Sequence, residues 1–302
     1  MANKKNPTNP QILLQNAQKF IQNNEFELAS KILKEGQANF PKEFLFINLL
    51  AQISLRNKKI IDGITLLKQS LQINPQQQLV MFDLGIALSL NDQLDEAVIF
   101  FDKSIELEPR NLKVYVRKAI TLRKLNRVND SIDCYQKIID LDPNFIDAYT
   151  NKAELLYSIG ELEESLHFYQ QAIKIDIENP TLFIRCGIIF SKLDRIGEAI
   201  SSYKKSIAIT SENPGAFKNL AYIFKDLRQY DEACFYLKKT AEINPDYEVL
   251  TNLAQIYCQL GNYKEGIVHY DKAIKVQPGN AEAHALKGYA YNSQGEFDQA
   301  IL

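Results

Sequence analysis

The chain has 302 residues, of which 46% are hydrophobic and 24% are charged, so it carries enough apolar surface for a folded core and is not disordered as a whole. Lysine and arginine total 35 against 37 for aspartate and glutamate, and this balance argues against a protein built mainly to bind nucleic acid or an anionic membrane. No apolar run reaches membrane-spanning length, and the four cysteines form no CxxC pair, so we expect a cytoplasmic protein.

A 34-residue period organises the sequence. Proline recurs at this spacing at Pro41, Pro75, Pro109 and Pro143. We number each repeat so that these prolines fall at position 32, and the repeats then start at Pro10, Phe44, Gln78, Leu112, Ile146, Pro180, Pro214, Tyr247 and Ala281. The eighth start follows a one-residue deletion, and the ninth repeat is truncated. Residues 1–9, which precede the array, are predicted to be a disordered tail.

Each repeat is predicted to form two helices joined by a turn. Three repeats start with an Asn-Pro pair, which places an N-cap before a proline at the first helical position, so the first helix begins at position 1. Position 15 is Asn, Asp or Gly in seven of nine repeats, as expected where a helix ends in the left-handed conformation. Small residues at position 20 predict that two helices approach closely there, and position 8 is always Ala or Gly. Large apolar residues at position 24 are predicted to fill the space between neighbouring repeats.

This pattern resembles the tetratricopeptide repeat (TPR). The family's positions 4, 7, 8, 11, 20, 24 and 27 are matched in one repeat by Tyr149, Lys152, Ala153, Leu156, Ser165, Tyr169 and Ala172. The resemblance covers residues 10–302 and implies an all-α fold, a right-handed α-solenoid in which helix-turn-helix units stack into a superhelix. It also implies that the first helices make most of the concave wall.

The ninth repeat ends only a few residues into its second helix, at Leu302. A solenoid usually ends in a polar capping helix, so we expect the chain to be the N-terminal part of a longer protein. Any catalytic domain would then follow Leu302. The unfinished repeat leaves Phe297 and Ile301 uncovered, which predicts self-association through this end.

The sequence contains no pattern typical of an active site. His167, His269 and His284 occupy different repeat positions and have no metal-ligand spacing. We interpret His284, at position 4, as a packing residue, and Cys134 and Cys186 as small interior residues without a histidine to activate them. Phosphate-binding and nucleophile-elbow motifs are also missing. We therefore predict no metal, no cofactor and no enzymatic activity for this chain.

The implied groove wall consists of positions 2, 5, 6, 9, 12 and 13. Position 6 holds a polar row in five successive repeats, made by Arg117, Asn151, Arg185, Asn219 and Asn252. Asparagine can pair with a peptide unit, and arginine suits carboxylates or carbonyls, so the row is typical of a surface that binds an extended chain. The alternative, that position 6 is merely solvated, stays open because the first three repeats carry Gln15, Leu49 and Asp83 there.

Basic residues favour an electropositive wall. The segment from Arg110 to Val128 has seven basic residues and no acidic one, and Lys113 joins Arg117 at groove positions. Lys218 and Tyr222 occupy the wall of a later repeat. The predicted peptide-binding residues are Lys113, Arg117, Asn151, Arg185, Asn219, Asn252, Lys218 and Tyr222.

The first hypothesis for function is a non-catalytic scaffold that binds an extended, acidic segment of a partner protein. A second follows from resemblance to O-linked N-acetylglucosamine transferases, in which a position-6 asparagine ladder contacts the substrate backbone. Asn151, Asn219 and Asn252 match that ladder and Arg185 interrupts it, so the chain would be the substrate-recruiting arm of a larger transferase. The carboxylate clamp of chaperone-binding relatives is matched only by Lys113 and Arg117. RNA binding is not expected, because no base-reading pair recurs in each repeat.

Overall fold

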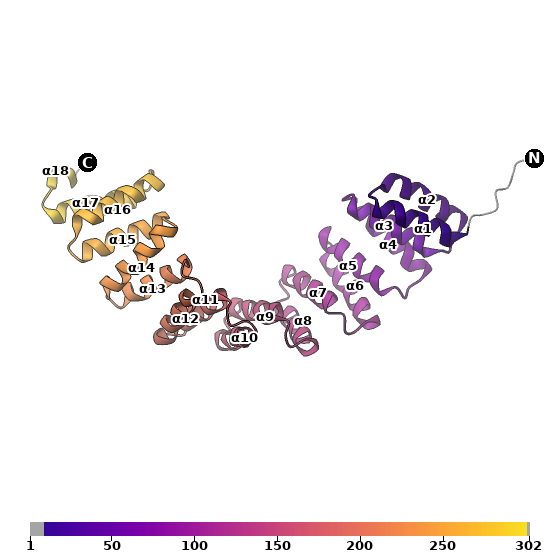
Figure 1. Ribbon diagram of the computed structural model, residues 1–302, viewed down its shortest axis with the longest axis horizontal. Coiled ribbons are helices and arrows are strands. Elements are labelled where there is room, and N and C mark those ends of the chain that lie inside the picture. Colours follow the sequence, from indigo (N-terminus) through magenta and orange to yellow (C-terminus); the bar gives the residue numbers. More distant parts are fainter. Residues whose placement is uncertain (1–8, 301–302) are drawn as a thin grey trace, which may run out of the picture. The chain divides into compact units, whose positions relative to one another are not determined.

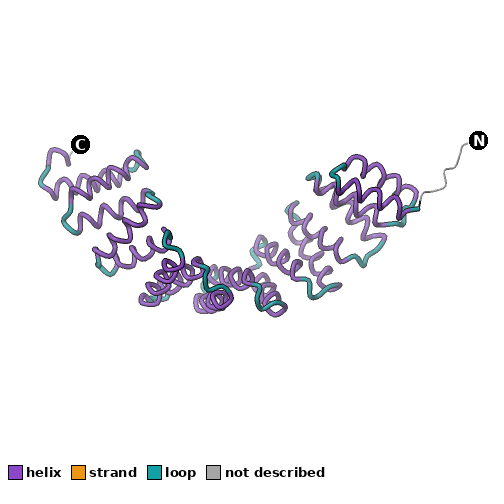
Figure 2. Tube along the Cα trace, viewed as in Figure 1, coloured by secondary structure: helices purple, strands orange, loops and turns teal. Residues whose placement is uncertain are grey.

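The computed structural model describes residues 9–300, and every regular element in this range is an α-helix (Figures 1 and 2). The helices alternate between the first and the second member of a pair. The first members are α1 (Pro10–Gln22), α3 (Phe44–Arg56), α5 (Gln78–Leu90), α7 (Leu112–Lys124), α9 (Ile146–Ser158), α11 (Pro180–Lys192), α13 (Pro214–Asp226), α15 (Tyr247–Gln259) and α17 (Ala281–Gln294). The second members are α2 (Phe26–Asn39), α4 (Ile60–Ile73), α6 (Leu94–Leu107), α8 (Val128–Leu141), α10 (Leu162–Ile175), α12 (Ile196–Ile209), α14 (Tyr230–Ile243), α16 (Tyr263–Val276) and α18 (Phe297–Ala300).

The chain divides into two compact units, residues 1–155 and 156–302, and the division falls inside α9. Within each unit, helices that follow one another along the chain pack together. First helices of neighbouring pairs also touch, α1 with α3 and α5 with α7 in the first unit, and α11 with α13 and α15 with α17 in the second. Each unit is therefore a solenoid of stacked helix pairs, the all-α architecture that the sequence period predicts.

The starts of the first helices follow from local capping. Asn9, Asn179 and Asn213 each accept a hydrogen bond from a backbone N–H in the first turn, and each is followed by a proline. All nine first helices begin at position 1 of the repeat frame. Asn9 is the one residue of the expected tail that the structure describes, and the other eight lie outside the described residues.

The turn between the two helices of a pair is left-handed at position 15 in every repeat, with φ between 58° and 88°. The sequence predicts this conformation only for Asn, Asp and Gly, yet Lys58 (φ 59°) and Arg228 (φ 58°) adopt it as well. The N–H of the next residue donates to the carbonyl five residues before it, as Lys59 does to Ser54, and this bond recurs at the equivalent turns. The packing of the pair therefore imposes a conformation that costs a lysine or arginine about 1 kcal/mol.

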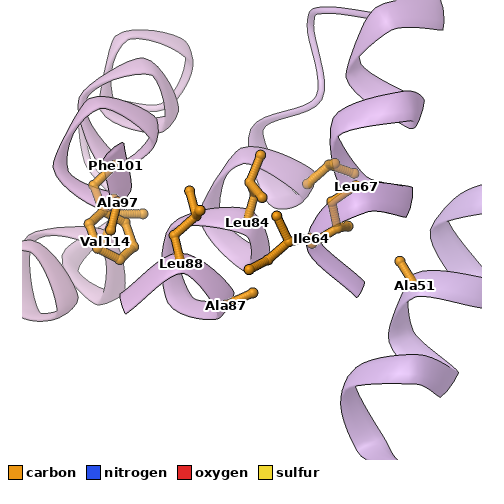
Figure 3. Close-up of a cluster of buried hydrophobic side chains, with 10 residues drawn as sticks. Ala51, Ile64, Leu67, Leu84, Ala87, Leu88, Ala97, Phe101 and Val114 are labelled. Carbon is orange, nitrogen blue, oxygen red and sulfur yellow. The ribbon is translucent and has the colours of Figure 1, made fainter. Parts of the chain in front are cut away.

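The core lies between the helices of a pair and between consecutive pairs (Figure 3). One cluster of the first unit runs from Ala51 of α3 through Leu67 of α4 and Leu84 of α5 to Phe101 of α6 and Val114 of α7. It explains why no pair is complete alone, because each pair lends apolar side chains to both neighbours.

Position 8 shows how closely the two helices approach. A Cβ atom on Gly85 would lie 2.6 Å from the ring of Phe101, and one on Gly187 would lie 2.6 Å from the ring of Tyr203. Phe101 and Tyr203 occupy position 24 of the same repeats, and both are buried. A bulky residue at position 24 thus fills space that a small residue at position 8 leaves open.

The tyrosines of position 24 belong to this core. Tyr135, Tyr169, Tyr203 and Tyr270 are all buried, and burial raises the pKa of Tyr203 to about 12. These rings are therefore packing residues, and they offer no exposed face on which a ligand could stack.

The interpretation of His284 as a packing residue is wrong. His284 is exposed, and its Nε2 lies 3.3 Å from the carbonyl oxygen of Pro278, at position 32 of the preceding repeat. Tyr115 and Tyr149 at the same position donate their hydroxyls to the carbonyls of the equivalent prolines, at 3.2 and 3.1 Å. Position 4 can therefore tie a helix to the preceding turn by a hydrogen bond, and this role suits a histidine as well as a tyrosine.

Candidate functional site

The candidate site is the exposed side of the first helices, which we call the A face and define by positions 2, 6, 9 and 13 of each repeat. These spacings of three and four residues place the four side chains on one side of a helix. In all nine first helices, none of these residues is buried. The A face is thus a continuous exposed surface within each unit, and it contains the polar row at position 6.

In the first unit, α7 presents a cationic row on the A face. Lys113, Arg117 and Lys124 are exposed at positions 2, 6 and 13, and no acidic group among the described residues lies within ion-pair distance of them. Two other basic residues of this segment do have acidic partners. Lys118 lies 2.5 Å from Asp102, and Arg127 lies 2.6 Å from its own acidic neighbour on α8. The A face of α7 therefore presents three cations that no acidic residue of the described chain neutralises.

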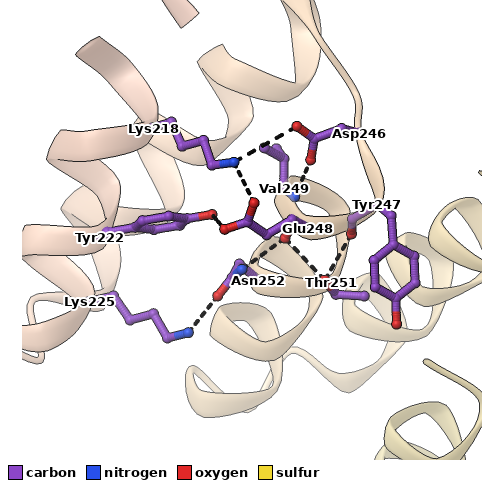
Figure 4. Close-up of polar contacts among 9 residues, drawn as sticks. All are labelled: Lys218, Tyr222, Lys225, Asp246, Tyr247, Glu248, Val249, Thr251 and Asn252. Carbon is purple, nitrogen blue, oxygen red and sulfur yellow. Dashed lines mark hydrogen bonds and ion pairs between the residues drawn. The ribbon is translucent and has the colours of Figure 1, made fainter. Parts of the chain in front are cut away.

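In the second unit, the basic residues of α13 are used within the chain (Figure 4). Lys218 Nζ lies 2.5 Å from Glu248 Oε2 on α15, and the Tyr222 hydroxyl donates to Glu248 Oε1 at 2.6 Å. These two hydrogen bonds lower the pKa of Glu248, while burial and the bond to this carboxylate raise the pKa of Tyr222. Asp246 adds a second carboxylate, 3.9 Å from Lys218. Glu248 and Asp246 thus neutralise the positive charge at this place.

The asparagines at position 6 are also engaged. Asn252 Nδ2 donates to the carbonyl of Glu248 at 2.8 Å, and its Oδ1 accepts from Lys225 Nζ at 2.5 Å (Figure 4). Asn151 Nδ2 donates to the carbonyl of Asp147, also one turn earlier, at 2.7 Å. At these two places the amides of the row are not fully free to bind a peptide, because each already uses part of its hydrogen-bonding capacity within the chain.

The predicted site residues therefore fall into three groups. Lys113 and Arg117 lie one turn apart on α7, and Lys218, Tyr222 and Asn252 are joined through Glu248. The remaining three are Asn151 on α9, Arg185 on α11 and Asn219 on α13. Glu248 was missed by sequence reasoning. The signal in the sequence is a lysine at position 5 and a tyrosine at position 9 of one repeat, followed by an acid at position 2 of the next repeat.

Other chemistry has little support in the described chain. Residues 9–300 contain no group of three or more His, Cys, Asp or Glu side chains placed to hold a metal ion. Cys134 and Cys186 are buried, and burial raises their pKa values to about 11 and about 12, so neither is a thiolate at neutral pH. None of the described helices combines the length and the apolar character needed to cross a membrane.

Family profiles match several segments of the chain. Profiles described as tetratricopeptide repeat match residues 80–111, 112–145, 134–167 and 216–247, and one described as TPR repeat matches residues 254–295. No curated protein matches the sequence.

Solved structures are similar to the chain in fold. The C-terminal part of a TPR repeat-containing protein from Cytophaga hutchinsonii has a TM-score of 0.71 at 13% identity, over 80% of this chain and 99% of that one. MamA has a TM-score of 0.51 at 21% identity, over 56% and 92% of the two chains. YrrB, described as a TPR protein with an unusual peptide-binding site, has a TM-score of 0.50 at 22% identity, over 61% and 95%. Likeness at these identities shows the fold.

Proposed function

Because this chain belongs to the tetratricopeptide-repeat family, we propose that it is a non-catalytic scaffold whose A face binds an extended, acidic segment of a partner protein. The observation that carries the proposal is the cationic row of Lys113, Arg117 and Lys124 on α7. These side chains are exposed, on one side of one helix, and have no acidic partner among the described residues.

A carboxylate-rich segment fits this row for two reasons. Arginine offers a planar fork of donors that matches a carboxylate, and lysine adds charge on a flexible stem. Exposed ionic contacts of this kind speed association and are screened by salt, so binding should weaken as ionic strength rises. An extended segment suits the site because the row runs along the length of α7, from position 2 to position 13.

No observation of the structure favours the alternative, a substrate-recruiting arm of a glycosyltransferase. That alternative depends on a ladder of asparagine amides that contact a peptide backbone, and Asn151 and Asn252 both donate to carbonyls of their own helix. Whether a transferase domain accompanies these repeats stays a prediction.

The test is affinity capture from a lysate with the chain and with two single charge reversals in the same repeat. Arg117→Glu places an acid in the cationic row, whereas Lys137→Glu makes the same change in charge on α8, away from the A face. We expect a small set of proteins to be captured at low salt, lost at high salt and lost with Arg117→Glu, but retained with Lys137→Glu. Capture that Arg117→Glu leaves unchanged, in a folded variant, would contradict the proposal.

A further inference from the structure

The A face of α5 and α7 combines exposed aliphatic side chains with unpaired cations. We call it the mixed patch and define it by Leu79, Ile86 and Leu90 of α5 and Lys113, Arg117 and Lys124 of α7. We infer that the mixed patch binds a segment in which leucine-like side chains accompany acidic ones, so that aliphatic residues lie over α5 and acids over α7. The inference rests on the proposed function and names the chemistry of its partner.

The aliphatic half of the mixed patch is unusually exposed. Leu79 retains 69% and Leu90 67% of its accessible surface, although leucine is among the residue types most often buried. Together with the partly buried Ile86, they occupy positions 2, 9 and 13, so they form one stripe along the whole of α5. Large apolar side chains gathered on one face, beside polar groups, are typical of a binding surface.

The two helices that form the mixed patch lie side by side. α5 and α7 are in contact, and Ser89 Oγ of α5 lies 3.2 Å from Thr121 Oγ1 of α7, at hydrogen-bond distance. Leu90 directly follows Ser89, and Lys124 lies one turn beyond Thr121. Because both helices start at position 1 of their repeats, the same register places Leu79 level with Lys113. A single extended segment that follows the two helices would therefore contact both kinds of side chain.

Asp83 at position 6 of α5 decides where the acids of the partner would lie. It is the only acidic residue on the A face of α5, and burial among its apolar neighbours raises its pKa. Its carboxyl has no ion pair with Arg117 or any other described cation. Where it is ionised, Asp83 repels acids from α5 and leaves the cationic row of α7 as their place.

The equivalent helices of the second unit lack this combination. α13 carries Gly215 and Asp226 at positions 2 and 13, and α15 carries Glu248 and Gln259 there. A segment with acids and leucines would find neither an aliphatic stripe nor unpaired cations on these two helices. The mixed patch therefore differs in chemistry from the A faces of α13 and α15.

The test is selection of a random peptide display library on the whole 302-residue chain, at low and at high salt. We expect the selected peptides to contain Asp or Glu together with Leu, Ile or Phe. At high salt the acidic preference should fade and the aliphatic preference should remain, because apolar contacts are not screened. One selected peptide is then synthesised, and its affinity is measured by fluorescence anisotropy.

Three changes separate the two halves of the patch. Leu79→Ser with Leu90→Ser, and separately Lys113→Glu with Arg117→Glu, should each weaken this peptide about tenfold or more, whereas Asp83→Asn should strengthen it about twofold to fivefold at low salt. Ile61→Ser is the matched control for the leucines, because Ile61 is 68% exposed on α4 and lies off the A face, and Lys137→Glu is the control for the charges. Circular dichroism checks that each variant is folded.

The outcomes distinguish this inference from the proposed function. Acidic peptides without aliphatic residues, whose binding the leucine changes leave unaltered, would overturn the inference and leave the proposed function standing. If the library yields no peptide, or if binding survives both the charge and the leucine changes, the inference and the proposed function both fail.

Discussion

The first helices α7 in the first unit and α13 in the second both carry basic residues, but in different states. Lys113, Arg117 and Lys124 of α7 have no acidic partner among the described residues, whereas Lys218 of α13 is paired with Glu248 of the next first helix. An acid stands at position 2 of the following repeat in both places, Glu248 in one and Asp147 in the other. The presence of an acid therefore does not explain the difference.

Register explains it. Glu248 meets Lys218 and Tyr222 at positions 5 and 9, while α7 has Val116 and Ile120 at these positions. Asp147 thus finds no cation, and the cations of α7 at positions 2, 6 and 13 find no acid. Lys218 is therefore neutralised in one unit, whereas Lys113, Arg117 and Lys124 remain available to an external ligand in the other.

The largest expected effect on stability tests the packing of position 8 against position 24, which occurs in both units. Gly85→Ala and Gly187→Ala would each bring a methyl group within 2.6 Å of a buried ring, so each should lower the free energy of unfolding of its unit by about 1 to 3 kcal/mol. Chemical denaturation, followed by circular dichroism, measures both. Gly197→Ala is the control, because a Cβ there meets no atom within 4 Å and a helical glycine is replaced by a better helix former. If only one of the two substitutions lowered the free energy of unfolding, the packing of position 8 against position 24 would differ between the units.

An effect of intermediate size is expected in the pH dependence of stability, which should differ between the units because all three histidines lie in the second. His269 stacks on Tyr257 with ring centres 5.3 Å apart, and burial, Lys272 and Lys238 lower its pKa from 6.5 to about 4. The folded state therefore favours the neutral ring, and its contribution to stability is complete above pH 6.5 and is lost as the pH falls toward 4. At pH 5 the loss is up to about 2 kcal/mol.

His269→Phe keeps the aromatic stack and removes the titration. The free energy of unfolding of this variant, minus that of the unchanged chain, should be larger at pH 5 than at pH 8. Urea denaturation at both pH values measures this difference. An equal shift for His269→Phe at both pH values would contradict the assignment.

The smallest expected effect on stability comes from removing the acid that pairs with Lys218. Glu248→Gln should cost less than about 1 kcal/mol, because the carboxylate is 56% exposed and its ion pair is screened. Hydrogen bonds lower the pKa of Glu248, so its stabilising contribution is present above the unfolded pKa and disappears as the pH falls through the lower folded value. The unchanged chain and the variant should thus converge in stability in acid, as measured by thermal unfolding.

The same substitution releases Lys218 and should increase the affinity of the second unit for an acidic peptide, measured by anisotropy at low salt. Asp147→Asn removes the equivalent acid of the first unit, which has no ion pair, and should leave stability unchanged within about 0.5 kcal/mol. If both substitutions cost the same, register does not explain the difference between the units.

The repeat pattern predicted the helix pairs from local features. Asn179 and Pro180 mark a helix start, and small residues such as Gly85 mark a close approach, because capping and volume act on neighbours whose spacing the period makes known. The exposed position of Arg117 follows from the same period. The pairing of Glu248 with Lys218 was not predicted, since it joins side chains 30 residues apart on separate helices.

The sequence by itself determined the fold class, the period and the side of each first helix that is exposed, because these follow from apolar periodicity and from small residues repeated nine times. Only the tertiary structure decided which charges are neutralised, why Lys58 and Arg228 adopt a left-handed turn, and why His284 is exposed. The physical reason is the same in all three. A side chain's state depends on which groups the neighbouring helices place within a few ångströms of it, and that depends on packing across the repeats rather than on residue type.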